Sequence, residues 1–596
     1  MKTTRREFIG GGSATLMGAA MGVHGMKQTP DEKTPGAPPA FATAPPAGPA
    51  VDAATFAVAE KLERVTNSEV HRAEMAQSWP QAMAPLYARR TGPNKVEFDE
   101  TLFPASGWNP MIPGAQTGPQ RDVFVPALPE AGKLPEREED IAFAAVWQLA
   151  HWIKTKQITS TRLTEIYLDR LKKYDGELRC VITLTEELAR AQAKRADAEI
   201  AAGQYRGPLH GIPWGAKDLL DTANIRTTYG AEPFRNRIPD KNAVVVDRLE
   251  KAGAVLVAKL SLGALALNDI WFGGQTMNPW LPEEGSSGSS AGPGAAVGAG
   301  LVGFAIGSET EGSIVSPSMR CGVTGLRPTF GRVPRTGAMT LCWSLDKLGP
   351  MARTVEDTML VLHAISGPDA GDLDSRPSYL YYDATVPVKG LKVGYFPEWM
   401  KQATEVDRHA LETLKELGLE PVEVSLPKLP YDSLNVILFA EAAASFEKIT
   451  LDGQVDEMKM QTPDSWPNIF RQSRFLSAVD YVQTDRLRRL GAEAMAKIFD
   501  QVDLLQVPSL QDTTLTLTNF TGHPSLTLRA GFVDVSQARS DWAPNPAMPL
   551  PRFNPPRRVP QGITLIGKLF DEGTIVRTGK ALEHRLNVWQ ERPKGF

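Results

Sequence analysis

Serines and glycines gather in one stretch of this sequence, residues 285–322, where they could build a nucleophilic site. The stretch is GSSGSSAGPGAAVGAGLVGFAIGSETEGSIVSPSMRCG. A serine hydroxyl attacks a carbonyl carbon once a base removes its proton, and glycines let backbone N–H groups approach the developing oxyanion. A linker would not contain the apolar run AAVGAGLVGFAIG, and a phosphate loop would need the order G-x-x-x-x-G-K-[ST]. The stretch therefore predicts a catalytic serine site.

Other residues with useful chemistry are scattered along the chain. The three cysteines (Cys180, Cys321 and Cys342) are far apart, and the eight histidines form no H-x-x-x-H pair. This pattern argues against a disulfide framework and a metal site, so we expect no metal and no cofactor. A net charge of −4 over 596 residues gives no electrostatic reason to expect nucleic acid or anionic lipid as a partner.

The elements around the serine-rich stretch have the pattern of an α/β protein. Apolar residues at helical spacing predict helices within residues 140–158, 159–174 and 185–205, with Thr159 in a position to cap the second. Residues 240–260 predict a helix, Gly253 and then the buried strand AVLVAK. VDLLQVPSL and QGITLIG predict strands, and residues 571–591 predict a closing helix. A single large α/β domain accounts for this order better than several small ones.

The N-terminus has the pattern of an export signal. Arg5 and Arg6 precede Phe8 and a weakly apolar run over residues 8–23, which is shorter than the roughly 20 residues of a membrane span. We therefore predict a Tat-type (twin-arginine) signal peptide over residues 1–26 and delivery to the periplasm, with the cleavage site left open. No later stretch is long and apolar enough to span a bilayer. Residues 27–50 predict a disordered Pro/Ala-rich tether. Residues 51–135 predict an N-terminal extension with a helix over 53–75 and irregular chain after it.

Five segments, in order, resemble the blocks of the amidase signature family. They are GPLHGIPWGAKDLLDT, FGGQTMNPW, GSSGSSAG with GSETEGSI, CGVTGLRPTFGRVPRTG, and GITLIGKLFDEGTIVRTGKALE. The resemblance implies an amidase signature domain over residues 136–596, with a mixed β-sheet core covered by helices.

The same resemblance implies a Ser-cisSer-Lys mechanism. The lysine of the first block is Lys217, the serine after a cis peptide is Ser289, and the nucleophile is Ser313. Ser287 and Ser290 compete locally for the middle role. A lysine can act as base only when it is neutral, and an apolar surrounding would lower its pKa. The candidate oxyanion donors are the backbone N–H groups of Thr310, Glu311, Gly312 and Ser313.

Some positions depart from the family pattern or have a structural interpretation. Val315 stands where the family commonly has arginine, and Glu309 stands where it commonly has aspartate, so the usual arginine–aspartate pair behind the nucleophile cannot form. We expect a structural role for four further residues near the blocks: His210, His523, Cys321 and Asp218. We expect the substrate pocket within residues 435–480 and 510–550, where Trp466, Phe470 and Phe475 suggest an apolar acyl group, although core packing is the more frequent role of such residues.

The sequence therefore predicts an exported amidase that hydrolyses a carboxamide through an acyl-enzyme, with a small-molecule or peptide amide as substrate. Two alternatives stay open: the amidase subunit of a tRNA-dependent amidotransferase, which works in the cytoplasm with partner subunits, and a catalytically silent binding protein on the same fold. The substrate and the oligomeric state are not predicted.

Overall fold

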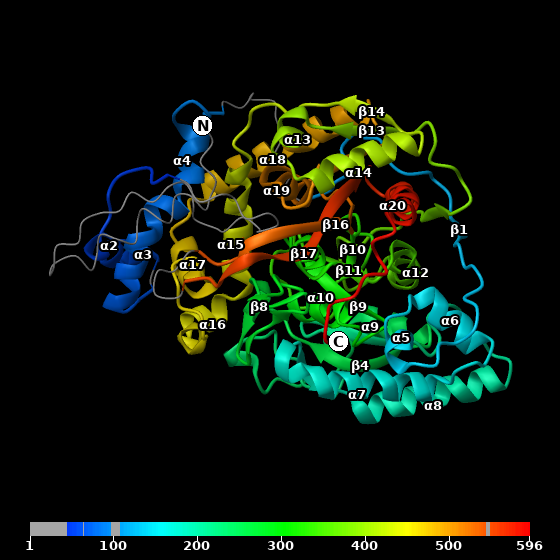
Figure 1. The fold of residues 1–596 in the computed structure, drawn as a ribbon. Helices are drawn as coiled ribbons and strands as arrows, with labels where there is room; N and C mark the ends of the chain where they lie inside the picture. The colour runs from blue at the N-terminus through cyan, green and yellow to red at the C-terminus, as the bar shows by residue number, and fades with distance from the viewer. Residues whose placement is uncertain (1–44, 64, 97–107, 544–548) are drawn as a thin grey trace.

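A computed structural model describes residues 45–63, 65–96, 108–543 and 549–596. The predicted signal peptide and most of the predicted tether lie outside the described residues. The fold is a large mixed β-sheet covered by helices (Figure 1), as the sequence predicts.

The central sheet has eleven strands and mixed polarity. β3 pairs parallel to β4 and β9, and β13 pairs parallel to β14 and β15, whereas the strands between these groups pair antiparallel. In spatial order the strands are β14 (Glu420–Glu423), β13 (Lys392–Tyr395), β15 (Leu504–Pro508), β17 (Arg552–Gly567), β16 (Ser525–Gln537), β10 (Thr324–Arg327), β11 (Lys347–Ala352), β9 (Phe304–Glu309), β3 (Pro213–Lys217), β4 (Val255–Leu260) and β2 (Val181–Leu184).

Three small two-stranded sheets accompany it. They are β1 (Val123–Val125) with β12 (Tyr381–Asp383), β5 (Ile270–Trp271) with β6 (Gly274–Gln275), and β7 (Met277–Asn278) with β8 (Leu281–Gly285).

The helices of the main domain follow the predicted pattern closely at its start. Thr159 accepts a hydrogen bond from the N–H of Arg162 at 3.0 Å and so caps α7, as expected. The helices are α5 (Glu138–Ala142), α6 (Val146–Lys154), α7 (Ser160–Leu178), α8 (Glu186–Ala201), α9 (Val244–Lys251), α10 (Ala291–Gly298), α11 (Val315–Cys321), α12 (Val355–Ile365), α13 (Pro397–Gln402), α14 (Glu405–Glu416), α15 (Asn435–Ser445), α16 (Glu447–Leu451), α17 (Trp466–Ser473), α18 (Ala478–Phe499), α19 (Asp512–Phe520) and α20 (Glu572–Leu586). Short 3₁₀ helices are η1 (Glu232–Phe234), η2 (Ala264–Ala266), η3 (Tyr431–Leu434) and η4 (Gln454–Glu457).

Helices pack on both faces of the sheet. Along β17, Gly567 faces Ile575 of α20, whereas Gly562 faces Met319 of α11. Side chains alternate between faces along a strand, so α20 and α11 lie on opposite faces. α12 and α14 contact α20, and α10 contacts α11. α7 and α8 cover the end of the sheet at β4, along the lower side of Figure 1.

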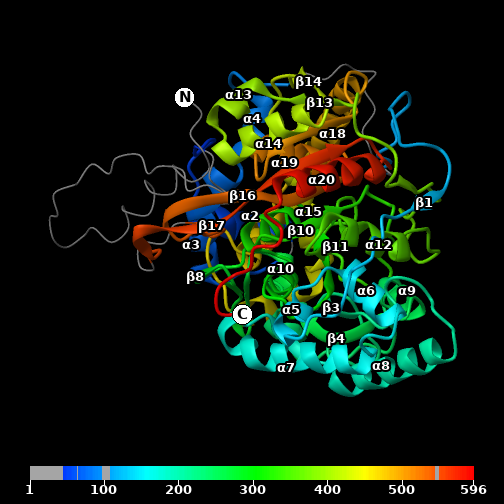
Figure 2. The same ribbon diagram turned by 45° about the vertical axis from the view of Figure 1, so that its right-hand side comes forward.

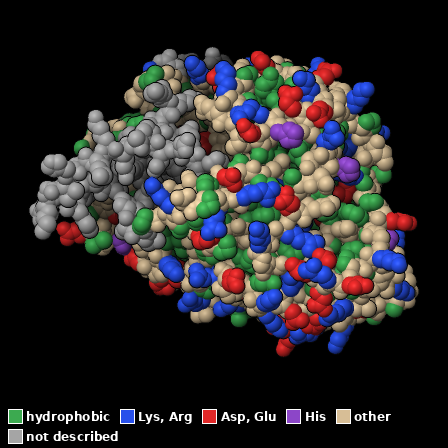
Figure 3. Space-filling model, in the orientation of Figure 1, with side chains coloured by type: hydrophobic (Ala, Val, Ile, Leu, Met, Phe, Trp, Pro, Cys, Tyr) green, Lys and Arg blue, Asp and Glu red, His purple; other side chains and the backbone are tan. Residues whose placement is uncertain are grey.

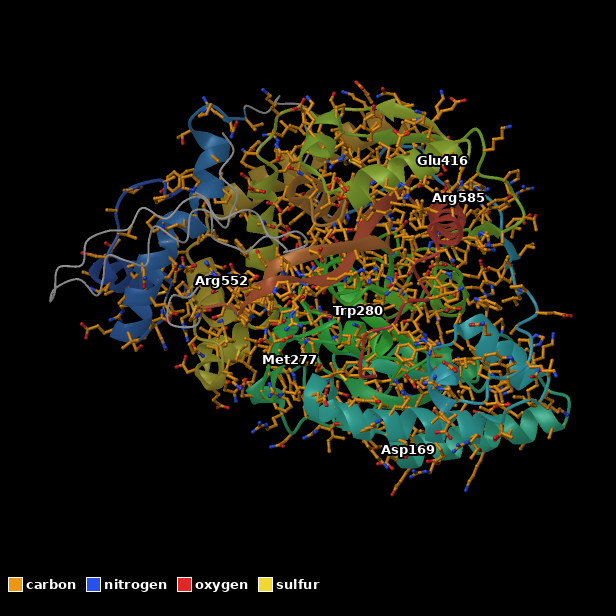
Figure 4. All side chains as sticks on the ribbon, viewed as in Figure 1. Asp169, Met277, Trp280, Glu416, Arg552 and Arg585 are labelled. Carbon is orange, nitrogen blue, oxygen red and sulfur yellow. The ribbon has the colours of Figure 1, made fainter. Side chains whose placement is uncertain are left out.

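Segments that are far apart in the sequence contact one another at the surface of the fold. Figure 2 shows the chain end beside α7, where the rings of Phe596 and Tyr174 lie 5.0 Å apart. α14 and α20 meet at the surface, where Arg585 and Glu416 form an ion pair of 3.1 Å (Figure 4). Basic and acidic side chains are interspersed over the face in Figure 3. Within the described residues, no helix is long and apolar enough to cross a membrane.

The N-terminal extension differs from the prediction. Instead of one helix over 53–75, it has α2 (Ala53–Glu63), α3 (Glu69–Ala82) and α4 (Ala84–Arg90). Ser68 starts α3 by accepting the N–H of His71 at 3.2 Å, so the helical pattern breaks at a capping residue that the prediction overlooked. The prediction of irregular chain after residue 75 is also wrong, since helix continues to residue 90 with a single break.

α3 contacts α17, and α4 contacts α15 and η3; Figure 1 shows α3 beside α17. Phe56 packs edge-on against Trp79 and Phe475, with ring centroids 5.3 and 5.2 Å apart. Ser78 accepts a hydrogen bond from Asn468 of α17 at 2.9 Å. The extension is therefore an integral layer of the described structure.

Candidate active site

Lys217 stands at the end of β3 and is completely buried. Its Nζ lies 2.8 Å from Ser289 Oγ, 2.8 Å from Ser308 Oγ and 3.0 Å from Ser290 Oγ. Burial lowers the pKa of Lys217 well below its ordinary value, against the charges of Asp346 and Glu309, which act to raise it. A buried amine among hydroxyl groups is the environment that favours a neutral lysine.

Ser289 lies on the loop between β8 and α10, after a cis Gly288–Ser289 peptide bond, as the resemblance implies. No side chain fits at Gly288, because a Cβ there would lie 1.7 Å from the carbonyl oxygen of Asn268. Asp541 holds the preceding residues: its Oδ2 accepts from Ser287 Oγ at 2.6 Å and from the N–H of Gly288 at 3.2 Å. Its Oδ1 pairs with Arg320 at 2.9 Å.

The neighbouring serines have other hydrogen-bond partners. The Ser290 hydroxyl donates to the carbonyl oxygen of Ser308 at 3.0 Å and accepts the N–H of Ser308 at 3.1 Å. The Ser287 hydroxyl proton is used by Asp541. A hydroxyl has a single proton, so in this geometry Ser287 and Ser290 have none to exchange with Lys217. Of the three serines considered for the middle role, Ser289 is the one that contacts the lysine with its proton uncommitted.

Ser313 lies in the turn between β9 and α11, and its side chain is nearly buried. The N–H of Ser290 donates to the carbonyl oxygen of Ser313 at 3.1 Å, which joins the two serine motifs through the backbone. Within the described residues, no hydrogen bond joins the side chains of Ser289 and Ser313. Gly312 has φ of 92°, which favours glycine, and a Cβ there would also crowd Leu515 at 3.1 Å.

The turn also presents backbone donors. Within the described residues, the N–H groups of Gly312 and Ser313 meet no acceptor. Glu309 instead takes the next two N–H groups, those of Ile314 and Val315, at 2.8 and 2.9 Å. Donors without a partner beside a serine are what an oxyanion site requires.

A buried ion pair lies behind this turn. Glu309 Oε1 accepts from Arg327 at 2.7 Å and from Asn519 at 2.9 Å. At the position where the family commonly has arginine, this chain has Val315, as the sequence indicates. Arg327 from β10 provides the positive charge that pairs with Glu309. Arg327 was not singled out from the sequence, although it lies within the quoted block CGVTGLRPTFGRVPRTG. Its role depends on a contact between β9 and β10 that sequence spacing does not reveal.

The residues expected to be structural are placed accordingly. Asp218 forms a fully buried pair with Lys259 at 3.0 Å. His210 Nε2 lies 3.0 Å from Glu199. His523 Nδ1 lies 2.8 Å from Thr521, and burial lowers the pKa of His523 to about 3. Cys321 is buried, and burial raises its thiol pKa.

The aromatic residues expected near the pocket are packed against other rings. Trp466 and Phe470 stack with centroids 5.3 Å apart, and Trp466 Nε1 donates to the carbonyl oxygen of Leu265 at 2.9 Å. Phe475 belongs to the aromatic cluster of the N-terminal extension. Within the described part of the chain, no group of three or more His, Cys, Asp or Glu residues is arranged to hold a metal ion.

The fold is that of the amidase signature structures, and comparison with known proteins gives the family. A family model described as Amidase matches residues 162–576. The chain belongs to the amidase signature family and is an enzyme that acts on amide C–N bonds.

Several relatives resemble the chain over nearly their whole length. The A subunit of the glutamyl-tRNA(Gln) amidotransferase of Moorella thermoacetica is 34% identical over 489 residues, covering 76% of this chain and 99% of the relative. Its counterpart in Coxiella burnetii is 31% identical over 498 residues, covering 75% and 98%. Among solved structures, the native peptide amidase of Stenotrophomonas maltophilia has a TM-score of 0.63 and 27% identity, covering 76% of this chain and 98% of its own.

Proposed function

We propose that the protein hydrolyses a carboxamide with Ser313 as nucleophile and Lys217 as base. Ser313 Oγ forms a bond to the amide carbon, its proton passes to Ser289, and the Ser289 proton passes to Lys217. The tetrahedral oxyanion is stabilised by backbone N–H groups of residues 310–313. The C–N bond then breaks, and the proton of Lys217 returns through Ser289 to the departing nitrogen. Water attacks the acyl-enzyme by the reverse proton path and releases the acid.

The observation that carries this proposal is the contact of 2.8 Å between Lys217 and Ser289 in a fully buried setting. A charged lysine would hold its protons and could not activate a serine, whereas a neutral amine accepts one. The lowered pKa of Lys217 supports the neutral form. His523 and His210, the two histidines near the family blocks, are engaged elsewhere, so neither of them competes for the base.

Two finer functions share this chemistry. The first is a free-standing amidase, exported as the N-terminal sequence indicates, and the similarity to a peptide amidase supports it. The N-terminal helices α2, α3 and α4 lie before the family match, and of these α3 contacts α17 and α4 contacts α15; a free-standing amidase is compatible with this additional layer.

The second candidate is the amidase subunit of a tRNA-dependent amidotransferase, in which amide hydrolysis would supply ammonia to partner subunits. The curated relatives favour it over the first, since the two amidotransferase sequences described above are 31–34% identical to this chain over 98–99% of their own length. Export and this function exclude each other, because charged tRNA is in the cytoplasm.

Ammonia release separates the two functions. The purified protein is given a panel of aliphatic, aryl and peptide amides, then glutamine with and without the partner subunits of an amidotransferase, with Ser313→Ala as control in each arm. Release by the protein alone supports the free-standing amidase. Release from glutamine only with the partners supports the amidotransferase candidate. No Ser313-dependent release in any arm, together with no labelling by a fluorophosphonate, would contradict the proposed hydrolysis.

A further inference from the structure

A small pocket with both polar and apolar lining lies beside the hydroxyl groups that surround Lys217. We name it the relay pocket and define it by Ser308, Thr310, Arg335, Met339, Asp346 and Leu348, which line it. Its volume is about 20 Å³, which is room for one water molecule. Ser308 connects the pocket to the lysine, since its Oγ lies 2.8 Å from Lys217 Nζ.

Asp346 is the carboxylate of this pocket, and it is held firmly. Its Oδ1 accepts from the Thr310 hydroxyl at 2.7 Å, and its Oδ2 accepts the N–H groups of Leu341 and Cys342 at 2.8 and 3.0 Å. The side chain is nearly buried. These hydrogen bonds hold the Asp346 carboxylate in a fixed position relative to Lys217 and Ser308.

The other charged groups near Lys217 are neutralised by close partners. Glu309 on β9 pairs with Arg327 at 2.7 Å, and Lys347 of β11 also lies beside this pair. Burial lowers the pKa of Lys347 to about 7. On β4, Lys259 pairs with Asp218 at 3.0 Å.

Asp346 differs from these groups. Within the described residues, no Lys, Arg or His side chain lies within 4 Å of its carboxylate. Arg335 reaches its backbone oxygen at 3.5 Å, but the Arg335 guanidinium pairs with Asp372 and Asp374 at 2.7 and 2.8 Å. Arg335 and Lys347 act on Asp346 only from a longer distance, so within the described residues Asp346 is a negative charge near Lys217 that forms no close ion pair.

We propose that Asp346 is a positioning residue of the proton relay, which acts on Lys217 across the relay pocket and sets the pH range in which the lysine can serve as base. This inference rests on the proposed function of Lys217. Within the described residues, the Asp346 carboxylate forms hydrogen bonds with Thr310, Leu341 and Cys342 and none with Lys217, Ser289 or Ser313, so it acts through the lysine. Its charge favours the protonated lysine, so it limits how far burial lowers the pKa of Lys217 and keeps the amine basic enough to take a proton from serine.

The direction of the effect follows from this charge. The reactive form of the enzyme has neutral Lys217, so activity is present above the pKa of the lysine and is lost as the pH falls through it. Removing the charge of Asp346 lowers that pKa further. The acid limb of the pH profile should therefore move to lower pH, by about one pH unit, the lower end of the effect of a nearby opposite charge.

The test uses a fluorophosphonate probe, which needs no knowledge of the substrate. The rate constant of serine labelling is measured between about pH 5 and pH 10 for the native enzyme and for Asp346→Asn and Asp346→Glu. Asparagine removes the charge and should move the acid limb down, whereas glutamate keeps the charge and should leave it near the native position. Should the asparagine variant not fold, Asp346→Ser removes the charge in the same way and takes its place.

Asp357 provides a matched control. It is also a buried carboxylate that accepts two backbone N–H groups, those of Val146 and Trp147 at 2.9 and 3.0 Å, but it does not line the relay pocket. Asp357→Asn should leave the acid limb in place. A folded, labelled neutral variant of Asp346 that keeps the native limb would overturn the inference, as would an equal displacement by Asp357→Asn.

Failure of the proposed function gives a different result. If Lys217 is not the base, Lys217→Arg labels as fast as the native enzyme. If Lys217 is the base but Asp346 has only a structural role, Lys217→Arg is not labelled and the Asp346 variants change the rate without moving the limb.

Discussion

The three hydroxyl groups around Lys217 limit the directions in which the hydrogen bonds of a neutral amine can run. A neutral amine has two N–H donors and one lone pair, so it can donate to two of the hydroxyl oxygens and must accept from the third. Ser290 cannot be the donor, because its proton goes to the carbonyl oxygen of Ser308. Ser289 or Ser308 must then point a proton at the lysine. In the proposed mechanism Ser289 transfers the proton between Ser313 and Lys217, whereas Ser308 lines the relay pocket.

Lys217→Arg tests the base at this scale. Guanidinium keeps the positive charge but does not lose its proton in proteins. The variant should lose about 10²–10⁴-fold in kcat/KM, the usual contribution of a general base. The native profile should show a limb that rises with pH, set by the lowered pKa of Lys217. The measurement is kcat/KM against pH with any accepted amide.

The outcome also separates lysine from histidine. Burial lowers the pKa of His523 to about 3, so His523 stays neutral over the measured range and adds no limb near the ordinary histidine pKa of about 6.5. An active arginine variant would exclude Lys217 as the base and turn attention to His210.

At the scale of elements, the site depends on segments far apart in the chain. Asp541 lies 254 residues from Ser287, to which it is hydrogen bonded, and Arg320 completes this buried group. Breaking such a pair from one side leaves an uncompensated buried charge, which typically costs about 3–5 kcal/mol. The loop that contains Ser289 is thus held by the segment that follows β16.

The N-terminal helices are fastened to the main domain through Phe56. Phe56→Ala should destabilise the attachment by about 3 kcal/mol, the lower end of the cost of truncating a buried phenylalanine. Limited proteolysis should then cut faster within residues 53–90, while the main domain keeps its melting temperature. Val58 is on the same helix and is 64% exposed, so Val58→Ala should change nothing. Equal cleavage of the two variants would show that the aromatic cluster does not hold the extension.

Across the whole molecule, individual helices and strands were predicted well from the sequence, whereas the pairing of distant strands and the buried polar contacts were not. The strand at β4 and the helix α20 carry uniform apolar or periodic signals, and both were found where expected. The order of eleven strands was not predicted, because paired residues of neighbours such as β10 and β16 are about 200 positions apart in the sequence. Buried polar residues such as Arg327, Ser308 and Asp346 look like surface residues in sequence, so their places in the site became visible only in three dimensions.

Localisation remains a prediction at this scale, because Arg5 and Arg6 lie outside the described residues. The twin-arginine interpretation predicts that replacing both by lysine leaves folded, active enzyme in the cytoplasm of a Tat-competent host. Cell fractionation followed by fluorophosphonate labelling measures this directly, with a known Tat substrate as control. Unchanged delivery to the periplasm, or retention of the native chain in the cytoplasm, would remove the basis for export and strengthen the amidotransferase candidate.

The identity of the labelled residue tests the central claim, that Ser313 is activated by Lys217. The protein is treated with a fluorophosphonate, digested, and analysed by tandem mass spectrometry to locate the phosphonylated side chain. We predict one adduct, on Ser313, in the native enzyme and no adduct in Ser313→Ala or Lys217→Arg. An adduct on Ser289, Ser290 or another residue of the native enzyme, or full labelling of the arginine variant, would contradict the claim.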